Sequence, residues 1–504
     1  MINKTLLTLG LAAACISSCV SSPEALKIDP TKIVTEDYLG NGVQWSAYPH
    51  ADTENAEWGL LMTDEKWERN FHRLSYMQPK LLRVVDQANW RYMVGFDKAG
   101  NPILDFNTDE VKAVERILKY AQSNDITVLF GEWGTPYKMH DTTFGHSDKF
   151  DGADDPKWIS SIVEYLNYLI IEKGYTCIKH YNLINEPNGD WASTKGDFEE
   201  WKRGVIALNK ALKEKGLDKY ISVAGPDAVT RYDNPQSQYT GAEWVVQTVK
   251  QLDAEVGIYD THDYTEYDLV RSGEFENVHR KIAEYVKPTG KQIIFGELGF
   301  SRNGEANQKR AAEDPYSCED TQMDVYDYSY GIDMTDALIQ SMNAGYSGSA
   351  AWALDDAMHT CGDLGNKNEL KRWGMWNSLG TELCNNPLDE NMRPWFYSWS
   401  LMCRYIPFGS TILEVPKTNK TGLRYAVSVY DGEYTFSIVN NSSQEQSMTF
   451  DLPNSKLSFD KYIYQENNRT TDADGFPTPV EESINISKKA ITIPANSFVL
   501  LTSI

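Results

Sequence analysis

Apolar runs typical of strands alternate with helical patterns from Gly42 to about residue 398. Each run is four or five residues long, and most are followed by a polar stretch and then by a segment whose apolar residues recur every three or four positions. This succession predicts β-strands separated by helices. Eight strands are expected, at Val43–Ser46, Leu81–Val85, Thr127–Gly131, Tyr181–Ile184, Ile221–Ala224, Ile258–Thr261, Ile293–Gly296 and Ser349–Ala353.

The helical pattern is clearest from Glu110 to Ser123, where Val111, Val114, Ile117, Leu118 and Ala121 share one face. Similar stripes occur at Trp158–Ile171, Phe198–Leu212, Trp244–Leu252, Val278–Val286 and Met334–Met342. Eight strands that alternate with helices predict an α/β fold, a parallel (β/α)8 TIM barrel over residues 41–398, rather than an open sheet. The long loops after the third, seventh and eighth strands would build the rim of its active site.

From about Trp399 the pattern changes to alternating strands without helices. Two runs, Tyr425–Tyr430 and Tyr434–Val439, flank the turn signal Asp431-Gly432-Glu433 and predict a hairpin. Further strands are expected at Ser447–Leu452, Lys461–Gln465, Ile484–Ile486 and Ala490–Leu501. Residues 399–504 are therefore predicted to form a C-terminal antiparallel β-sandwich domain.

The first 18 residues have the features of an export signal, with Lys4 before an apolar run from Leu6 to Ile16 that is too short to span a bilayer. The sequence Ile16-Ser17-Ser18-Cys19 resembles the bacterial lipobox, in which the cysteine after the cleavage site is lipidated. We expect an exported lipoprotein held in the outer membrane by Cys19, on its periplasmic or its outer face. Residues 19–40 would form a tether and an entry strand. The alternative is a plain secretory signal whose cysteine is incidental.

Composition narrows the possible partners. The 504 residues include 72 acidic and 48 basic ones, for a net charge of −24, so binding to nucleic acid is not expected. A hydrophobic content of 41% excludes a disordered chain. The 14 Trp and 29 Tyr suit sugar binding, but they also suit an ordinary core.

Five cysteines follow Cys19, at positions 177, 318, 361, 384 and 403. Cys318 and Cys361 are the best candidates for a disulfide, because both fall in loops of the predicted rim. The alternative is that all five are buried free thiols. His140 and His146, with Asp141 and Asp148, make only a weak metal site, and we expect no metal.

Two glutamates close apolar runs where a barrel presents its chemistry, at the carboxyl ends of the strands. Glu186 follows the fourth run in Asn185-Glu186-Pro187, and Glu297 follows the seventh in Phe295-Gly296-Glu297. Glycoside hydrolysis needs such a pair, one carboxyl to protonate the leaving oxygen and one carboxylate to attack the sugar or to activate water. The alternative for each residue alone is a solvated acid in a turn.

These motifs resemble clan A of the glycoside hydrolases, most closely family 39, with families 5 and 30 as neighbours. Four further residues match the pattern of the clan. They are Arg83 in the second strand, His262 and Tyr264 in the sixth, and Trp352 in the eighth.

The resemblance implies a retaining hydrolase of a poly- or oligosaccharide that needs no cofactor, with Glu297 as nucleophile and Glu186 as acid/base. Asn185 would bind the sugar's 2-hydroxyl, Arg83 and Tyr264 would keep Glu297 ionised, and Trp352 would be a sugar platform. His262 is expected to contribute to substrate binding.

Other rim residues leave alternatives open. Trp133 and Trp191 are candidate sugar platforms, or they cap the barrel. Four arginines, Arg91, Arg231, Arg271 and Arg302, would favour a hydrolase of uronic-acid-containing glycans if they converged, but they could equally be scattered surface charges. A further alternative is a surface glycan-binding protein on a barrel that has lost catalysis.

Overall fold

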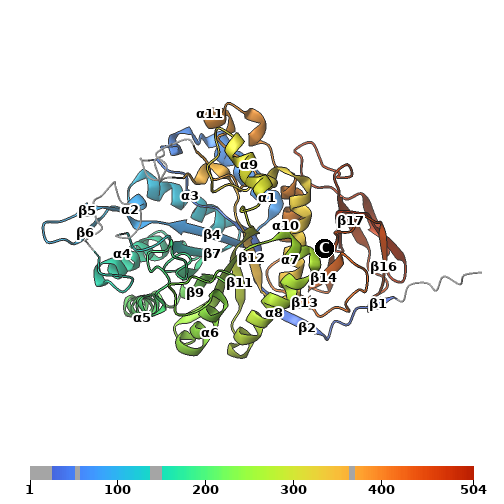
Figure 1. The fold of residues 1–504 in the computed structure, drawn as a ribbon, viewed down its shortest axis with the longest axis horizontal. Helices are drawn as coiled ribbons and strands as arrows, with labels where there is room; N and C mark the ends of the chain where they lie inside the picture. Colours follow the sequence, from blue (N-terminus) through green and yellow to red (C-terminus); the bar gives the residue numbers. More distant parts are fainter. Residues whose placement is uncertain (1–24, 51–56, 137–149, 362–368) are drawn as a thin grey trace, which may run out of the picture.

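The computed structural model describes residues 25–50, 57–136, 150–361 and 369–504. The prediction of a (β/α)8 barrel is confirmed, because eight parallel strands close on themselves in one sheet (Figure 1). In chain order they are β3 (Gly40–Gln44), β4 (Leu81–Asp86), β7 (Thr127–Glu132), β8 (Ile178–Asn182), β9 (Ser222–Val229), β10 (Val256–Thr265), β11 (Ile293–Phe300) and β12 (Gly348–Ala351). All eight predicted strands are present, with boundaries that differ by a few residues.

Helices follow each strand and cover the outside of the barrel. The principal ones are α1 (Asp64–Met77), α3 (Asp109–Ser123), α4 (Pro156–Asn167), α5 (Phe198–Lys215), α6 (Gly241–Leu252), α8 (Glu274–Val286), α10 (Tyr328–Ala344) and α12 (Trp395–Arg404). A π-helical turn, Tyr168–Glu172, extends α4. Helix α1 was not predicted because its buried face includes Asn70 and Arg73 beside Trp67, Leu74 and Met77, which interrupts the apolar stripe.

Shorter elements build the rim around the strand ends. They are α2 (Ala88–Arg91), the hairpin β5 (Met93–Phe96) and β6 (Pro102–Leu104), α7 (Tyr267–Ser272), α9 (Glu305–Glu313) and α11 (Gly380–Cys384). Inside the barrel, a layer of small and branched side chains fills the floor, formed by Leu39, Leu81, Leu129, Ala224, Ile258, Ile294 and Ala350.

The C-terminal sandwich is also confirmed. Its larger sheet has the order β18-β17-β20-β15-β14-β13-β2, and the smaller has the order β1-β16-β19. The strands are β1 (Leu26–Lys27), β2 (Ile33–Tyr38), β13 (Ser410–Leu413), β14 (Leu423–Tyr430), β15 (Glu433–Asn440), β16 (Gln446–Asp451), β17 (Phe459–Tyr464), β18 (Glu481–Ile484), β19 (Ala490–Ile493) and β20 (Ser497–Thr502).

Two details of the sandwich differ from the sequence-based expectation. The run Ala490–Leu501 is not one strand, because the chain turns at Pro494–Asn496 and β19 and β20 join different sheets. The N-terminal strands β1 and β2, from the segment assigned to tether and entry strand, pair with β16 and β13 of the sandwich. Among the described residues, no helix combines the length and apolar character needed to cross a membrane.

Candidate active site

The two predicted catalytic glutamates meet at the mouth of the barrel. Glu297 lies within β11, and Glu186 lies four residues beyond the end of β8. Both are buried, with 3% and 9% of their surface exposed. One oxygen of each carboxylate and one ring nitrogen of His262 all lie within 4.8 Å of one another. The fold therefore brings together two carboxylates that are 111 positions apart in the sequence.

Glu297 is held by donors from two other strands. Arg83 of β4 donates from Nη1 to Oε1, and Tyr264 of β10 donates its hydroxyl to Oε2. The ring of His262 lies 3.5 Å from Oε2. These contacts fix the orientation of the carboxylate at the position where a nucleophile is expected.

Arg83 and Tyr264 both act to lower the pKa of Glu297, in the direction expected of partners that keep it ionised. Burial raises the pKa of Glu297, and the positive charges of His262 and Arg83 offset only part of that effect. The net direction is nevertheless upward, because removal from water costs the buried carboxylate more than its partners return.

Glu186 is held by a different pair of donors. Its Oε1 lies 2.9 Å from Nδ1 of His262, and its Oε2 accepts a hydrogen bond of 2.8 Å from Nε1 of Trp191. Its backbone has a left-handed φ of 47°, which a residue with a side chain adopts only when its surroundings hold it there. The backbone N–H donates to Oδ2 of Asp227 at 3.3 Å, which helps to hold this conformation.

His262 is fully buried and connects the two glutamates. Burial alone would lower its pKa, but the charges of Asp227 and Glu297 outweigh that effect and raise it well above the ordinary value. Its Nε2 forms an ion pair with Asp227 at 2.8 Å. His262 is therefore an imidazolium whose contacts are with the carboxylates that surround it.

Asp227 is a site residue that sequence reasoning did not select. It comes from β9, is buried, and contacts Arg83 Nη2 at 3.1 Å in addition to His262 and the backbone of Glu186. Burial acts to raise its pKa, but His262 and Arg83 lower it to about 2. The available signal was its position near the carboxyl end of β9, three residues after the apolar run Ile221–Ala224.

Two amides complete the polar layer beneath the glutamates. Asn185 accepts a hydrogen bond of 2.7 Å from Arg83 Nη2. Asn182, also outside the predicted set, lies 2.7 Å from both Asp227 and Asp260, whose Oδ1 accepts from the backbone of Gly296 at 2.7 Å. A Cβ at Gly296 would lie 2.4 Å from that oxygen, so this close approach next to Glu297 requires glycine.

The variant Asp227→Asn tests whether the negative charge of Asp227 matters for the reaction. Asp227→Asn keeps the size of the side chain and removes the largest charge that raises the pKa of His262. We expect that pKa to fall and kcat/KM at pH 7 to decrease about 10- to 100-fold, because His262, which contacts both glutamates, loses the charge that holds it protonated. Imidazole ¹⁵N NMR against pH would report the shift directly. The ion pairs of His262 stabilise the fold only while the ring is protonated, at a pH below its pKa. Because this pKa is lower in the variant, their contribution to the free energy of unfolding should be lost at a lower pH than in the unmodified protein.

A matched control lies on the neighbouring strand β10, which also carries His262. Asp263 is buried and pairs with His279 at 2.8 Å and with Arg231, away from the glutamates. Asp263→Asn should leave the His262 resonance where it is in the unmodified protein. Equal shifts of that resonance in both variants would show that Asp227 acts only through general stability.

Aromatic side chains gather at the strand ends on one side of the mouth. Trp352, the residue after β12, stacks on His359 with ring centroids 5.1 Å apart, and Trp133 packs edge-on against Trp352 at 6.0 Å. Trp352 and His359 are only 6% and 5% exposed. Burial lowers the pKa of His359 to about 3, so this ring is neutral.

A second aromatic pair is open to solvent. Trp191 is 51% exposed although its indole donates to Glu186, and its ring lies 4.7 Å from that of Tyr232. Thus the structure places Trp133 with Trp352, and Trp191 with the acid/base candidate.

The four rim arginines do not converge on a common site. Each forms an ion pair of its own, Arg91 with Asp86 and Glu110, Arg231 with Asp263 and Glu266, Arg271 with Asp333, and Arg302 with Asp320. Their charges are already neutralised, which removes the observation that would have favoured uronic-acid-containing substrates.

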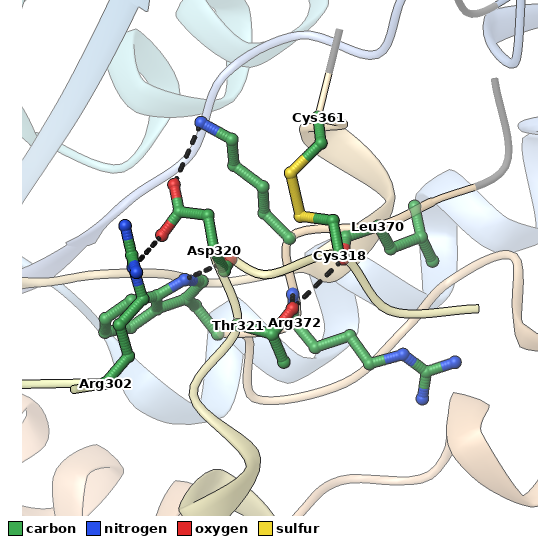
Figure 2. The surroundings of a disulfide bond; sticks show 9 residues. Arg302, Cys318, Asp320, Thr321, Cys361, Leu370 and Arg372 are labelled. Atoms are coloured by element: carbon green, nitrogen blue, oxygen red, sulfur yellow. Dashed lines mark hydrogen bonds and ion pairs between the residues drawn. A yellow bond between two sulfur atoms is a disulfide. The ribbon is translucent and has the colours of Figure 1, made fainter. Parts of the chain in front are cut away.

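The rim loops after β11 and β12 are joined covalently. Cys318 and Cys361 form the predicted disulfide, whereas Cys177, Cys384 and Cys403 are buried free thiols. Beside the disulfide, Asp320 pairs with Arg302 at 2.7 Å and with Lys371 at 3.2 Å (Figure 2).

The same loops position an aromatic ring against Tyr264, which donates to Glu297. The backbone carbonyl of Asp320 accepts a hydrogen bond from the indole of Trp373, whose ring lies 5.2 Å from that of Tyr264. The linked loops therefore support the tyrosine that binds Glu297.

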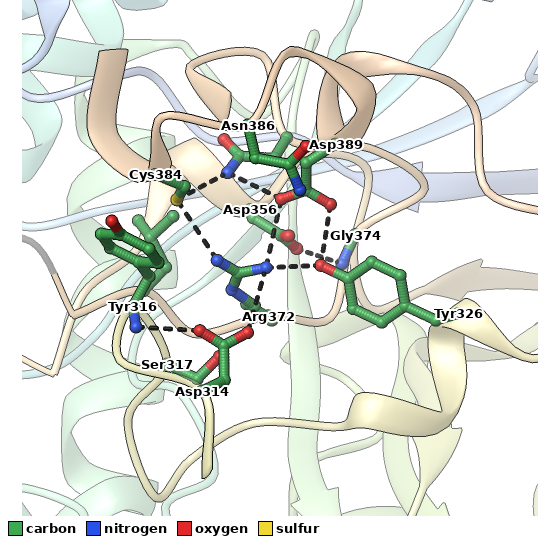
Figure 3. Close-up of polar contacts among 12 residues, drawn as sticks. Asp314, Tyr316, Ser317, Tyr326, Asp356, Arg372, Gly374, Cys384, Asn386 and Asp389 are labelled. Atoms are coloured by element: carbon green, nitrogen blue, oxygen red, sulfur yellow. Dashed lines mark hydrogen bonds and ion pairs between the residues drawn. The ribbon is translucent and has the colours of Figure 1, made fainter. Parts of the chain in front are cut away.

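Arg372 connects the same loops to the segment around α11 (Figure 3). Its guanidinium contacts Asp389 at 3.2 Å, Asp314 at 3.5 Å, the hydroxyl of Tyr326 at 2.6 Å and the sulfur of Cys384 at 3.2 Å. Arg372 is 4% exposed, so this network is a structural support of the rim.

Two groups of described residues bring three potential metal ligands within 4.8 Å of one another. They are Glu186, His262 and Glu297, and Asp227, Asp260 and His262. Both groups share His262, whose Nδ1 contacts Glu186 and whose Nε2 contacts Asp227. The weak site predicted at His140 and His146, and the lipidation candidate Cys19, lie outside the described residues.

Comparison with known proteins supports the chemistry of the site. The family model for cellulase, glycosyl hydrolase family 5, matches residues 174–336, a segment that includes Glu186, His262 and Glu297. A search of curated protein sequences finds no match.

Solved structures resemble the whole chain. They include a conserved exported protein from Bacteroides fragilis, with a TM-score of 0.68 at 13% identity over 95% of this chain and 100% of that one. A family 30 subfamily 8 xylanase from Clostridium acetobutylicum has a TM-score of 0.60 at 12% identity, covering 95% and 99%. A family 39 enzyme from Xanthomonas axonopodis pv. citri has a TM-score of 0.59 at 11% identity, covering 96% and 97%.

At these identities the structural likeness shows the fold. The family match, over about a third of the chain, and the geometry of the site together support an O-glycosyl hydrolase of the clan A type. The predicted resemblance to that clan, with families 5, 30 and 39 as neighbours, is confirmed.

Proposed function

We propose that the protein is a retaining glycoside hydrolase that cleaves a poly- or oligosaccharide by double displacement. The observation that carries this proposal is the approach of the two carboxylates, with one oxygen of Glu186 and one of Glu297 within 4.8 Å. Retaining enzymes have carboxyl groups about 5–5.5 Å apart, whereas inverting enzymes need about 6.5–9.5 Å to admit a water molecule.

In the first step Glu297 attacks the anomeric carbon, and the bond from that carbon to the leaving oxygen breaks. Glu186 gives its proton to the leaving oxygen, so the departing group is a neutral alcohol. In the second step Glu186 takes a proton from water, whose oxygen attacks the anomeric carbon and releases Glu297. Two displacements at one carbon restore the original configuration.

The neighbouring residues keep these two groups in place. Arg83 and Tyr264 donate to opposite oxygens of Glu297. Because Oδ1 of Asn185 accepts from Arg83, its Nδ2 is the group that can donate to the 2-hydroxyl of the sugar. A protein that only bound glycans would gain nothing from burying two carboxylates beside an imidazolium, since burial of charge is costly.

Product analysis tests the proposal. The protein would be incubated with plant, fungal and host polysaccharides, including xylans, β-glucans and arabinans, and the products identified by chromatography. Proton NMR during the first minutes should show a newly formed anomeric centre with the configuration of the cleaved bond. Initial formation of the opposite anomer would contradict double displacement, and hydrolysis of none of the substrates would leave the glycan-binding alternative.

We also propose that the protein is exported and anchored in the outer membrane through lipid on Cys19. The basis is the lipobox-like sequence Ile16-Ser17-Ser18-Cys19 after an apolar signal segment. Cys19→Ser should abolish metabolic labelling with a fatty acid and release the enzyme from the membrane fraction. Cys15→Ser is the control and should remain labelled. Continued membrane association of the Cys19 variant would refute the anchor.

A further inference from the structure

Trp191 and Tyr232 form an exposed aromatic pair next to the acid/base candidate. Trp191 comes from the loop after β8, and Tyr232 from the loop after β9. Their ring centroids are 4.7 Å apart, and the hydroxyl of Tyr232 donates to Asp190 at 3.0 Å. Half of the Trp191 surface is exposed although its indole nitrogen is bonded to Glu186, so the face of the ring is available to a ligand.

The two oxygens of Glu186 show on which side of the cleaved bond this pair lies. Oε1 is bonded to His262, whose ring also lies 3.5 Å from Glu297. Oε2 is bonded to Trp191. In a double displacement the anomeric carbon lies by the nucleophile and the leaving oxygen lies by the acid/base. Trp191 is therefore next to the group that departs.

The aromatic group formed by Trp352 and His359 is enclosed, whereas the pair Trp191 and Tyr232 is open to solvent. Trp352 and His359 are almost fully buried, and Trp352 follows β12, the strand that pairs with the one carrying Glu297. An enclosed group suits the sugar that becomes attached to Glu297, because this sugar must be shielded while the intermediate exists. The open pair suits the sugar that must leave and be replaced by water.

We propose that Trp191 and Tyr232 form a subsite for the departing sugar, so that the substrate is a glycan in which a further residue follows the cleaved bond. This inference rests on the proposed function. Flat rings bind the apolar faces of a sugar, and the carboxylate of Asp190 beside Tyr232 disfavours a negatively charged residue here. The preferred occupant is a neutral sugar.

Two substrates with the same transferred sugar separate this subsite from the chemistry. One is the oligosaccharide identified by the polysaccharide panel, and the other is the glycosyl fluoride, whose leaving group is a single atom that needs no aromatic platform. Trp191→Ala should lower kcat/KM on the oligosaccharide by about 10- to 100-fold more than on the fluoride, because only the former loses contact with the ring. Tyr232→Ala should lower it by about tenfold more.

Two further variants sharpen the test. Trp191→Phe keeps a ring and removes the donor to Glu186, so the ratio between the two substrates should stay within about threefold of that of the unmodified protein. Tyr285→Ala removes another exposed aromatic ring, 55% exposed on α8, and should change neither rate. Melting temperatures of all variants would be compared.

The outcomes separate the subsite from the proposed function. If the unmodified protein hydrolyses neither substrate, the proposed function fails. If it hydrolyses both and Trp191→Ala reduces both rates equally, the subsite assignment is wrong. It is also wrong if Trp191→Phe shows the same selective loss as Trp191→Ala, because Trp191 would then act only through Glu186, whose proton the oligosaccharide needs more than the fluoride does. The subsite is supported if Trp191→Ala and Tyr232→Ala both show a selective loss on the oligosaccharide and Trp191→Phe does not.

Discussion

Glu297→Ala is expected to be inactive on every substrate, with a loss on the order of 10⁵-fold or more. The reason is that no other group can form the covalent intermediate, and removal of the nucleophile stops both displacements. The loss should be the same for good and poor leaving groups, since attack at the anomeric carbon is required in each case. Rates on a dinitrophenyl glycoside and on the natural oligosaccharide would be compared.

Azide provides the decisive control for this variant. It fits the space left by the Glu297 side chain and should attack the sugar once, giving a glycosyl azide of inverted configuration. Glu132→Gln is the matched variant, because Glu132 also ends a barrel strand and burial raises its pKa to about 8. It is largely uncharged at neutral pH and glutamine resembles it, so near-normal activity is expected. Residual turnover by Glu297→Ala with retained configuration would exclude Glu297 as the nucleophile.

Glu186→Ala should produce a loss that depends on the leaving group. A natural oligosaccharide needs its departing oxygen protonated, so kcat/KM should fall by about 10²–10⁴-fold. A dinitrophenyl glycoside needs little protonation, so its first step should be nearly unaffected, while its second step slows because water is no longer activated. Stopped-flow release of dinitrophenol should therefore show a rapid burst followed by slow turnover.

Azide again tests the assignment, with the opposite stereochemical result. It needs no general base and should accelerate the second step of Glu186→Ala, giving a glycosyl azide of retained configuration. Asp218→Ala is a suitable control, because Asp218 is exposed in the loop between α5 and β9, at the opposite end of the barrel strands from the glutamates. Equal losses on activated and natural substrates would show that Glu186 is not the acid/base residue.

The barrel was predictable from sequence because burial on both faces makes parallel strands continuous apolar runs, and such runs are visible without an alignment. The same reasoning located Glu186 and Glu297, since a charged residue that ends an apolar run must lie where the strand reaches the rim. It was less accurate at boundaries: the run Tyr181–Ile184 continues two residues beyond β8, because Leu183 and Ile184 are buried without being in the strand.

Local pattern therefore determined the order of elements, the two domains and the two glutamates of this protein. Only the folded chain decided which distant residues meet. Asp227 is one acid among 72 in the sequence, and it becomes important because β9 lies between β8 and β10 and places it beside His262 and Glu186. Likewise, β2 precedes the barrel in sequence yet pairs with β13 of the sandwich. These outcomes depend on burial and on strand neighbours, and both arise from contacts between residues far apart in sequence, which periodicity along the chain does not record.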